Sequence, residues 1–178
     1  MTRLPLVDPA TASGPTADLF ATVQRTLGAT PNMTKAMANS RALLKGYVEL
    51  SGALSRGVLP AGVREQIALA VAQSNGCSYC LSAHTYLGEN VAKLDTAELT
   101  AARKAVSADR KVAAILQLAV AVNDSRGDLA EDELDEARAA GVSDEEIAEV
   151  IGHVALNVLT NYFNKAADTE IDFPVVSV

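Results

Sequence analysis

Two cysteines, Cys77 and Cys80, are the only thiols in the 178-residue sequence, and they stand three positions apart. In a reducing compartment such a C-x-x-C pair is more often redox-active or metal-binding than a structural crosslink. On a helix that advances about 100° per residue, Cys80 lies roughly 60° from Cys77 around the axis, and His84 lies between them. Cys77 directly follows Gly76, so we expect it in the first helical turn, where unpaired N–H groups stabilise a thiolate.

Glu65 precedes the cysteines on a segment that is apolar on most sides. If Gly76 turns the chain so that two helices pack antiparallel, Glu65 lies about 16 Å and His84 about 12 Å from the turn, at a rise of 1.5 Å per residue. The two side chains would then be roughly level. A carboxylate that faces a histidine orients the ring and supports its charged form. The spacing therefore predicts a proton relay from Glu65 through His84 to the cysteine pair.

Each of these residues also has a structural interpretation. The cysteines could be a buried pair, or they could join His84 as three ligands of a zinc site. The sequence offers no second Cys or Cys-His cluster for a fourth ligand, so we expect neither a metal nor a cofactor. Glu65 taken alone could be an ordinary carboxylate in a first helical turn. The second histidine, His153, is interpreted as a satisfied core or interface residue.

The composition predicts helices as the elements that position these groups. The chain is rich in Ala but has no Trp, four Tyr and three Phe, and Ala favours helices whereas aromatic residues favour strands. No linker or low-complexity block divides the sequence. We therefore expect an all-α helical bundle, with an irregular leader over residues 1–15 and a single helical domain over residues 16–178.

Apolar periodicity and breakers place the individual helices. The expected segments are 16–28, 34–55, 60–75, 77–91, a helix capped by Asp95 with Glu98, then 108–123, 130–140, and a last long helix from Ser143 to about Ala166. Both Asp95 with Glu98 and Ser143 with Glu146 have capping-box spacing. In the last helix we expect a buried stripe of apolar residues, namely Ile147, Val150, Ile151, Val154 and Val158.

Charge and hydropathy limit the partners. The formal net charge is −7, and an acidic protein is a poor ligand for the phosphates of DNA or RNA. Neither a signal-peptide pattern nor an apolar run of membrane-spanning length is present. We therefore expect a cytoplasmic protein that binds neither nucleic acid nor membranes. Apolar residues spread around the helices at 60–75 and 147–163, which favours burial between subunits and hence a homo-oligomer.

The complete motif is Glu65, eleven residues, Cys77-Ser78-Tyr79-Cys80, three residues, then His84. It resembles the active-site pattern of the AhpD-like alkylhydroperoxidases within the carboxymuconolactone decarboxylase family. The stretch 141–164 is similar to the closing helix of the peroxidase-related members, and the resemblance covers roughly residues 20–174. It implies an all-helical subunit that assembles into trimers or hexamers.

The resemblance also implies a two-thiol peroxidase that reduces organic hydroperoxides or hydrogen peroxide. Cys80 would attack the peroxide, and Cys77 would resolve the sulfenic acid as a disulfide. A dithiol reductant, in this family sometimes a lipoyl-bearing protein, would complete the cycle. A thiol–disulfide oxidoreductase and a non-catalytic redox sensor are the alternatives, and the decarboxylase reaction is disfavoured because that branch lacks the C-x-x-C pair.

Tyr79 marks one departure from the family pattern, because the best-described alkylhydroperoxidases carry a second histidine at this position between the cysteines. The substitution bears on the level of activity and on the choice of reductant. The Tyr79 ring either packs or donates a hydrogen bond through its hydroxyl, and packing is the favoured interpretation.

Overall fold

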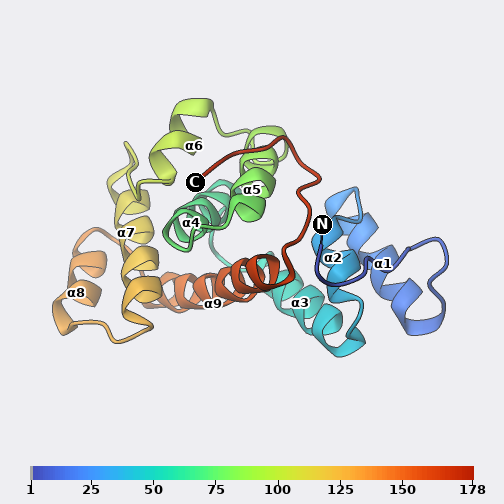
Figure 1. Cartoon of the computed structure of the whole chain (residues 1–178). Helices are drawn as coiled ribbons and strands as arrows, with labels where there is room; N and C mark the ends of the chain where they lie inside the picture. The colour runs from blue at the N-terminus through green and yellow to red at the C-terminus, as the bar shows by residue number, and fades with distance from the viewer. Residues whose placement is uncertain (1) are drawn as a thin grey trace.

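The computed structural model describes residues 2–178, and within them the chain forms nine helices and no strand. The helices are α1 (Gly14–Leu27), α2 (Asn32–Met37), α3 (Arg41–Leu54), α4 (Ala61–Ser74), α5 (Ser78–Asn90), α6 (Thr96–Ala102), α7 (Arg110–Ser125), α8 (Glu131–Ala139) and α9 (Asp144–Ala167). The expectation of an all-α fold is confirmed. Figure 1 shows α1 to α3 on one side of the central helices and α7 with α8 on the other.

Helix α4 is the centre of the bundle and packs against α5, α6, α7 and α9. Its side chains are apolar almost all round, so it can be stable only where other helices cover every face. Ile67, Leu69 and Val71 are each 0% exposed. Leu81 of α5 and Leu116 of α7 are likewise completely buried against this core. The central position of α4 gives Glu65 a rigid support.

Local sequence signals define most helix ends as expected. Asp95 and Glu98 form a capping box at the start of α6, and Ser143 and Glu146 form another at the start of α9. In each box, the side chain of the first residue accepts a hydrogen bond from the backbone of the second, whose carboxylate accepts one in return. These reciprocal bonds satisfy N–H groups that a helix start would otherwise leave unpaired.

Three expectations about the helices were wrong in detail. The segment 34–55 is two helices, because the Ser40 hydroxyl accepts a hydrogen bond from the Leu43 N–H and so begins α3 separately. The helix expected over 16–28 begins earlier, because α1 starts at Gly14 with Pro15 in its first turn, a position that suits proline. Ile151 does not belong to the buried stripe of α9, because its side chain is 45% exposed.

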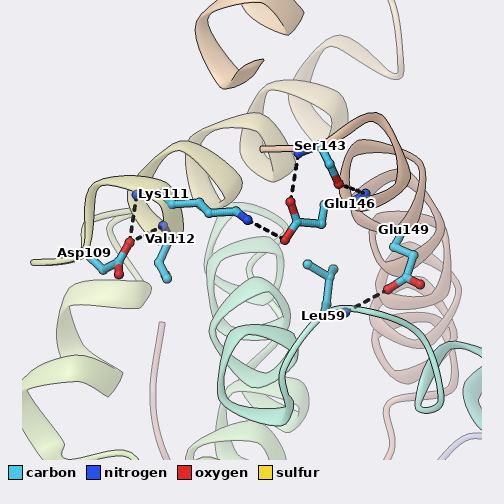
Figure 2. A network of polar contacts seen from close by, with 7 residues as sticks. All are labelled: Leu59, Asp109, Lys111, Val112, Ser143, Glu146 and Glu149. Carbon is cyan, nitrogen blue, oxygen red and sulfur yellow. Dashed lines mark hydrogen bonds and ion pairs between the residues drawn. The ribbon is translucent and has the colours of Figure 1, made fainter. Parts of the chain in front are cut away.

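A polar network joins α9 to α7 and to the loop before α4 (Figure 2). The Lys111 ammonium of α7 lies 2.8 Å from the Glu146 carboxylate. One turn further along α9, the Glu149 carboxylate accepts hydrogen bonds from the Val58 and Leu59 N–H groups at 2.8 and 3.1 Å. Glu149 therefore fixes the chain just before α4 begins.

The segment after α9 folds back over α5, as Figure 1 shows for the red end of the chain. The Val176 N–H donates to the Ser82 hydroxyl at 2.9 Å, and the Arg103 guanidinium donates to the Ser177 carbonyl at 2.8 Å. Phe173 packs against the rings of Tyr79 and Tyr86. Within residues 2–178, no helix combines the length and the apolar character that crossing a membrane requires.

Candidate functional site

The cysteine pair lies at the junction of α4 and α5. Gly76 adopts a left-handed conformation with φ of +63°, which glycine tolerates without steric cost. The Cys77 N–H then donates to the Ala72 carbonyl at 2.9 Å and the Gly76 N–H to the Gln73 carbonyl at 3.2 Å, the two bonds of a Schellman motif. The turn ends α4 and delivers Cys77 directly to the start of α5.

Cys77 is the N-cap residue of α5. It therefore lies one position before the first helical turn, in which the sequence analysis expected it. Its sulfur accepts a hydrogen bond from the Cys80 N–H at 3.2 Å. The two cysteines form a disulfide, with their Cα atoms 5.3 Å apart, and they are only 1% and 2% exposed. In the reduced protein, the free N–H groups of this helix start would stabilise a thiolate at Cys77.

Glu65 and His84 meet across α4 and α5. Glu65 Oε2 lies 2.8 Å from His84 Nδ1, and the side chains are 21% and 25% exposed. An ionised carboxylate can only accept, so this contact assigns the ring hydrogen to Nδ1 and leaves Nε2 available to a substrate or a water. Gly88 instead permits the close approach of α6 to α5, because a Cβ there would lie 2.6 Å from Leu99 Cδ2.

A pocket of about 280 Å³ brings the expected groups together. Cys80, His84 and Glu65 all line it, whereas Cys77 does not. Apolar side chains form much of the remaining wall, among them Leu27, Met33, Leu87, Val91, Leu156 and Phe173. The pocket therefore places Cys80 at the wall of a small, largely apolar cavity beside Glu65 and His84.

Helix α9 contributes a polar wall that the sequence analysis did not identify. Its residues His153, Asn157, Thr160 and Asn164 line the pocket and are each no more than 6% exposed. The Asn164 amide donates to Cys80 Sγ at 3.5 Å. These four residues recur at helical spacing, which was the available signal, but the apolar residues between them on α9 dominated the pattern.

His153 is buried as expected, but it is not satisfied, because its Nε2 atom has no hydrogen-bond partner. Burial, with the positive charge of Arg64 nearby, lowers the pKa of His153 below its ordinary value. Tyr47 lines the same pocket, and burial together with the charge of Glu65 raises the pKa of its hydroxyl to about 12. Both side chains are therefore neutral at physiological pH.

Tyr79 both packs and forms hydrogen bonds. Its hydroxyl accepts from the Met33 N–H at 3.1 Å and donates to Asp172 Oδ1 at 2.8 Å, while its ring meets Phe173 edge-on at 6.0 Å between centroids. Burial raises the pKa of this hydroxyl well above its usual range. Tyr79 thus ties α5 to α2 and to the C-terminal segment, and its hydroxyl is already engaged away from the thiols.

No group of three or more His, Cys, Asp or Glu side chains in residues 2–178 is arranged to hold a metal ion. The three zinc ligands that the sequence could offer were the two cysteines and His84. In the structure the cysteines are joined to each other, and the His84 ring contacts Glu65.

The fold and site together define an all-helical protein with a buried C-x-x-C disulfide beside a carboxylate–histidine pair. Residues 41–124 match the model of the carboxymuconolactone decarboxylase family. An alkyl hydroperoxide reductase of Mycobacterium tuberculosis is 34% identical over 92 residues, which are 51% of this chain but only 27% of that protein. The aligned region thus spans about a quarter of that relative.

Solved structures show the same fold over nearly the whole chain. A peroxidase-related protein of Ralstonia eutropha, described as an alkylhydroperoxidase AhpD core, has a TM-score of 0.85 at 23% identity and covers 96% of this chain and 92% of its own. The debrominase Bmp8, solved as a variant with 2,3,4-tribromopyrrole, has a TM-score of 0.82 at 21% identity over 97% and 92%. A peroxidase-related protein of Silicibacter has a TM-score of 0.81 at 23% identity over 95% and 91%.

Proposed function

We propose that the protein is a thiol-dependent peroxidase that reduces organic hydroperoxides or hydrogen peroxide through a dithiol/disulfide cycle of Cys77 and Cys80. One observation carries the proposal: Cys80 and the Glu65–His84 pair line the same small pocket. The domain family and the alkyl hydroperoxide reductase among the relatives support an oxidoreductase activity of this kind.

The first half of the cycle begins with both cysteines reduced. His84 Nε2, directly or through one water, takes the proton of the Cys80 thiol, and the Glu65 carboxylate stabilises the imidazolium that forms. The thiolate attacks the terminal oxygen of the hydroperoxide, so an S–O bond forms as the O–O bond breaks. The leaving alkoxide takes the proton from His84 and departs as an alcohol, and Cys80 is left as a sulfenic acid.

In the second half, the Cys77 thiolate attacks the sulfenic sulfur of Cys80. The S–S bond forms, the S–O bond breaks, and hydroxide leaves as water after it gains a proton. Two thiols have then supplied the two electrons that reduce the peroxide. An external dithiol restores the pair by thiol–disulfide exchange and is itself oxidised to a disulfide; a lipoyl group has this chemistry.

Access to the two sulfurs supports this division of roles. Cys80 lines the pocket and Cys77 does not, so a peroxide in the pocket meets Cys80 first. The Cys77 sulfur accepts a hydrogen bond from the Cys80 N–H at the start of α5. This environment favours the thiolate that is needed to close the disulfide. The 1% and 2% exposure of the two cysteines favours small substrates over protein disulfides, which a general thiol–disulfide oxidoreductase would have to admit.

A homo-oligomer remains part of the proposal. Ile151 and Tyr162 lie on α9 with 45% and 59% of their surfaces exposed, and apolar surface of this kind is commonly covered by a second subunit. Sedimentation equilibrium at micromolar concentration tests this point independently of catalysis. A trimer or hexamer is expected, and a monomer would contradict it.

The test of the proposal assigns the attacking sulfur. Reduced Cys77→Ser protein is treated with one equivalent of cumene hydroperoxide and then with dimedone, which traps sulfenic acids. We expect a dimedone adduct on Cys80 in this variant and none on Cys77 in the matched Cys80→Ser variant. A Cys77→Ser protein that forms no adduct and consumes no hydroperoxide would refute the peroxidase function.

A further inference from the structure

Asn164 makes a side-chain contact with a reacting sulfur from outside the C-x-x-C turn. Its amide nitrogen donates to Cys80 Sγ at 3.5 Å from α9, 84 positions away in sequence. Asn164 is 3% exposed, and its Oδ1 atom is buried without a hydrogen-bond partner. A buried amide with one unsatisfied atom is costly to keep, which calls for an explanation beyond packing.

The chemistry of the sulfur supplies that explanation. A disulfide sulfur is only a weak acceptor, so the oxidised pair uses the Asn164 N–H poorly and leaves Oδ1 unsatisfied. A thiolate is a full negative charge, and an N–H donor bonds it much more strongly. A protonated Cys80 thiol could instead donate to Oδ1. The amide therefore interacts better with either reduced form of Cys80 than with the disulfide.

We propose that Asn164 is a catalytic residue that stabilises the Cys80 thiolate, and that it thereby favours the reduced state of the Cys77–Cys80 pair. The inference rests on the proposed function for its biological meaning. Its physical content concerns only the ionisation of Cys80 and the thiol–disulfide equilibrium. Both can be measured in the absence of any hydroperoxide.

The neighbouring polar residues of α9 direct their side-chain hydrogen bonds to groups other than the sulfur. The Asn157 amide donates to the His153 carbonyl and the Thr160 hydroxyl donates to the Asn157 carbonyl, so both donors are used within α9. The Asn161 carbonyl oxygen accepts from the Asn75 amide on the α4 side, and its amide nitrogen is buried without a hydrogen-bond partner and makes no bond to sulfur. Asn164 alone among these four α9 side chains has a hydrogen bond to sulfur in the structure.

The first experiment measures the ionisation of Cys80 in the Cys77→Ser background, from the pH dependence of the iodoacetamide reaction rate. Asn164→Leu removes the donor without adding charge, and Asn164→Asp replaces it with an acceptor. A hydrogen bond to the charged form lowers a thiol pKa. We therefore expect the pH midpoint of the reaction rate, which reports the pKa of Cys80, to rise by about one unit in Asn164→Leu and further in Asn164→Asp. Asn157→Leu, on the same pocket wall but without a sulfur contact, is the control and should leave the midpoint unchanged.

The second experiment equilibrates the full cysteine pair with glutathione buffers at pH 7. Loss of Asn164 should favour the disulfide, so Asn164→Leu needs about tenfold more reducing buffer for half-reduction than the natural sequence. Circular dichroism confirms that each variant is folded, and Asn164→Asp serves if Asn164→Leu is not. A folded Asn164 variant with the natural midpoint and the natural glutathione equilibrium would overturn the inference. Failure of the peroxidase function would leave both measurements intact.

Discussion

Glu65 Oε2 lies 2.8 Å from His84 Nδ1, although the two residues are 19 positions apart and belong to different helices. The contact exists because Gly76 reverses the chain and because α4 and α5 then rise by equal amounts per residue. It joins a carboxylate from the most buried helix to the only histidine of α5, at the wall of the pocket that holds Cys80.

Removing the charge of this carboxylate should slow peroxide reduction. In Glu65→Gln the amide still reaches the His84 ring but no longer stabilises an imidazolium. We expect kcat/KM for cumene hydroperoxide, measured with dithiothreitol as reductant, to fall roughly 100-fold or more, the usual range for loss of acid–base assistance. His84→Gln should cost a similar amount, and the double variant little more, because the two act as one unit.

The control for these variants is Glu89→Gln, which changes an exposed carboxylate on α5. It should retain the natural rate. A Glu65→Gln protein with activity within about twofold of the natural sequence would show that the contact with His84 has only a structural role.

Tyr79→Phe should affect stability more than catalysis. The change leaves the Met33 N–H without its acceptor and removes the donor to Asp172. An unpaired buried N–H costs about 1–3 kcal/mol, so urea unfolding should show a loss of this size while peroxide turnover changes little. Tyr86→Phe, on the exposed side of the same Phe173 ring, is the matched control and should be close to neutral.

The opposite outcome for Tyr79 is equally measurable. A Tyr79→Phe protein that is as stable as the natural one but reduces peroxides about tenfold more slowly would mean that the hydroxyl serves the chemistry.

His153 should make the folded state sensitive to acid. Burial and the charge of Arg64 lower its pKa in the folded protein, against the opposing charges of Glu149 and Glu65. In the unfolded chain, His153 binds a proton near the ordinary histidine pKa of about 6.5, whereas in the folded protein it stays neutral to lower pH. The free energy of unfolding therefore falls as the pH drops below about 6.5, by at most about 1.4 kcal/mol per pH unit. The free energy of unfolding of His153→Gln should decline less steeply between pH 6.5 and the folded-state pKa.

Urea unfolding at a series of pH values measures the free energy of unfolding of both proteins. The difference between the two values is the quantity to follow, because the contributions of the acidic side chains that both proteins share cancel in it. Identical slopes for the natural sequence and His153→Gln would show that His153 titrates normally in the folded protein.

Glu149 should stabilise the start of α4 and, through it, the position of Glu65. Glu149→Ala removes the acceptor of the Val58 and Leu59 N–H groups, for which we expect a loss of about 1–2 kcal/mol, typical of a helix-cap deletion. Thermal unfolding measures the loss, and Glu145→Ala, an exposed carboxylate in the first turn of the same helix, is the comparison. Equal effects of the two substitutions would contradict a specific role for Glu149.

The sequence predicts those parts of the site that depend on local geometry. Helical rise alone places Glu65 level with His84, and Gly76 before Cys77 indicates a helix start at the cysteine pair. Local rules also identify the capping boxes of α6 and α9. In each case the interacting residues lie within one helix–turn–helix unit, so spacing determines which side chains can meet.

Contacts between distant helices could not be found in this way. Asn164 reaches Cys80 from 84 positions away, and no spacing rule connects two helices separated by three others. The Asp172 partner of Tyr79 lies on an irregular segment without periodicity. Ile151 has the apolar character of a core residue and yet is exposed, because the packing of α9 rather than hydrophobicity alone decides which side of the helix is covered.

One molecule of hydroperoxide should oxidise one Cys77–Cys80 pair to the disulfide. Reduced protein freed of excess reductant is mixed with increasing amounts of cumene hydroperoxide, and free thiols, cumyl alcohol and the mapped disulfide are measured together. We expect each equivalent of hydroperoxide to yield one equivalent of alcohol and to remove both thiols, with all of the product a Cys77–Cys80 disulfide. Thiols that persist in the presence of excess hydroperoxide, with no alcohol formed, would contradict this expectation.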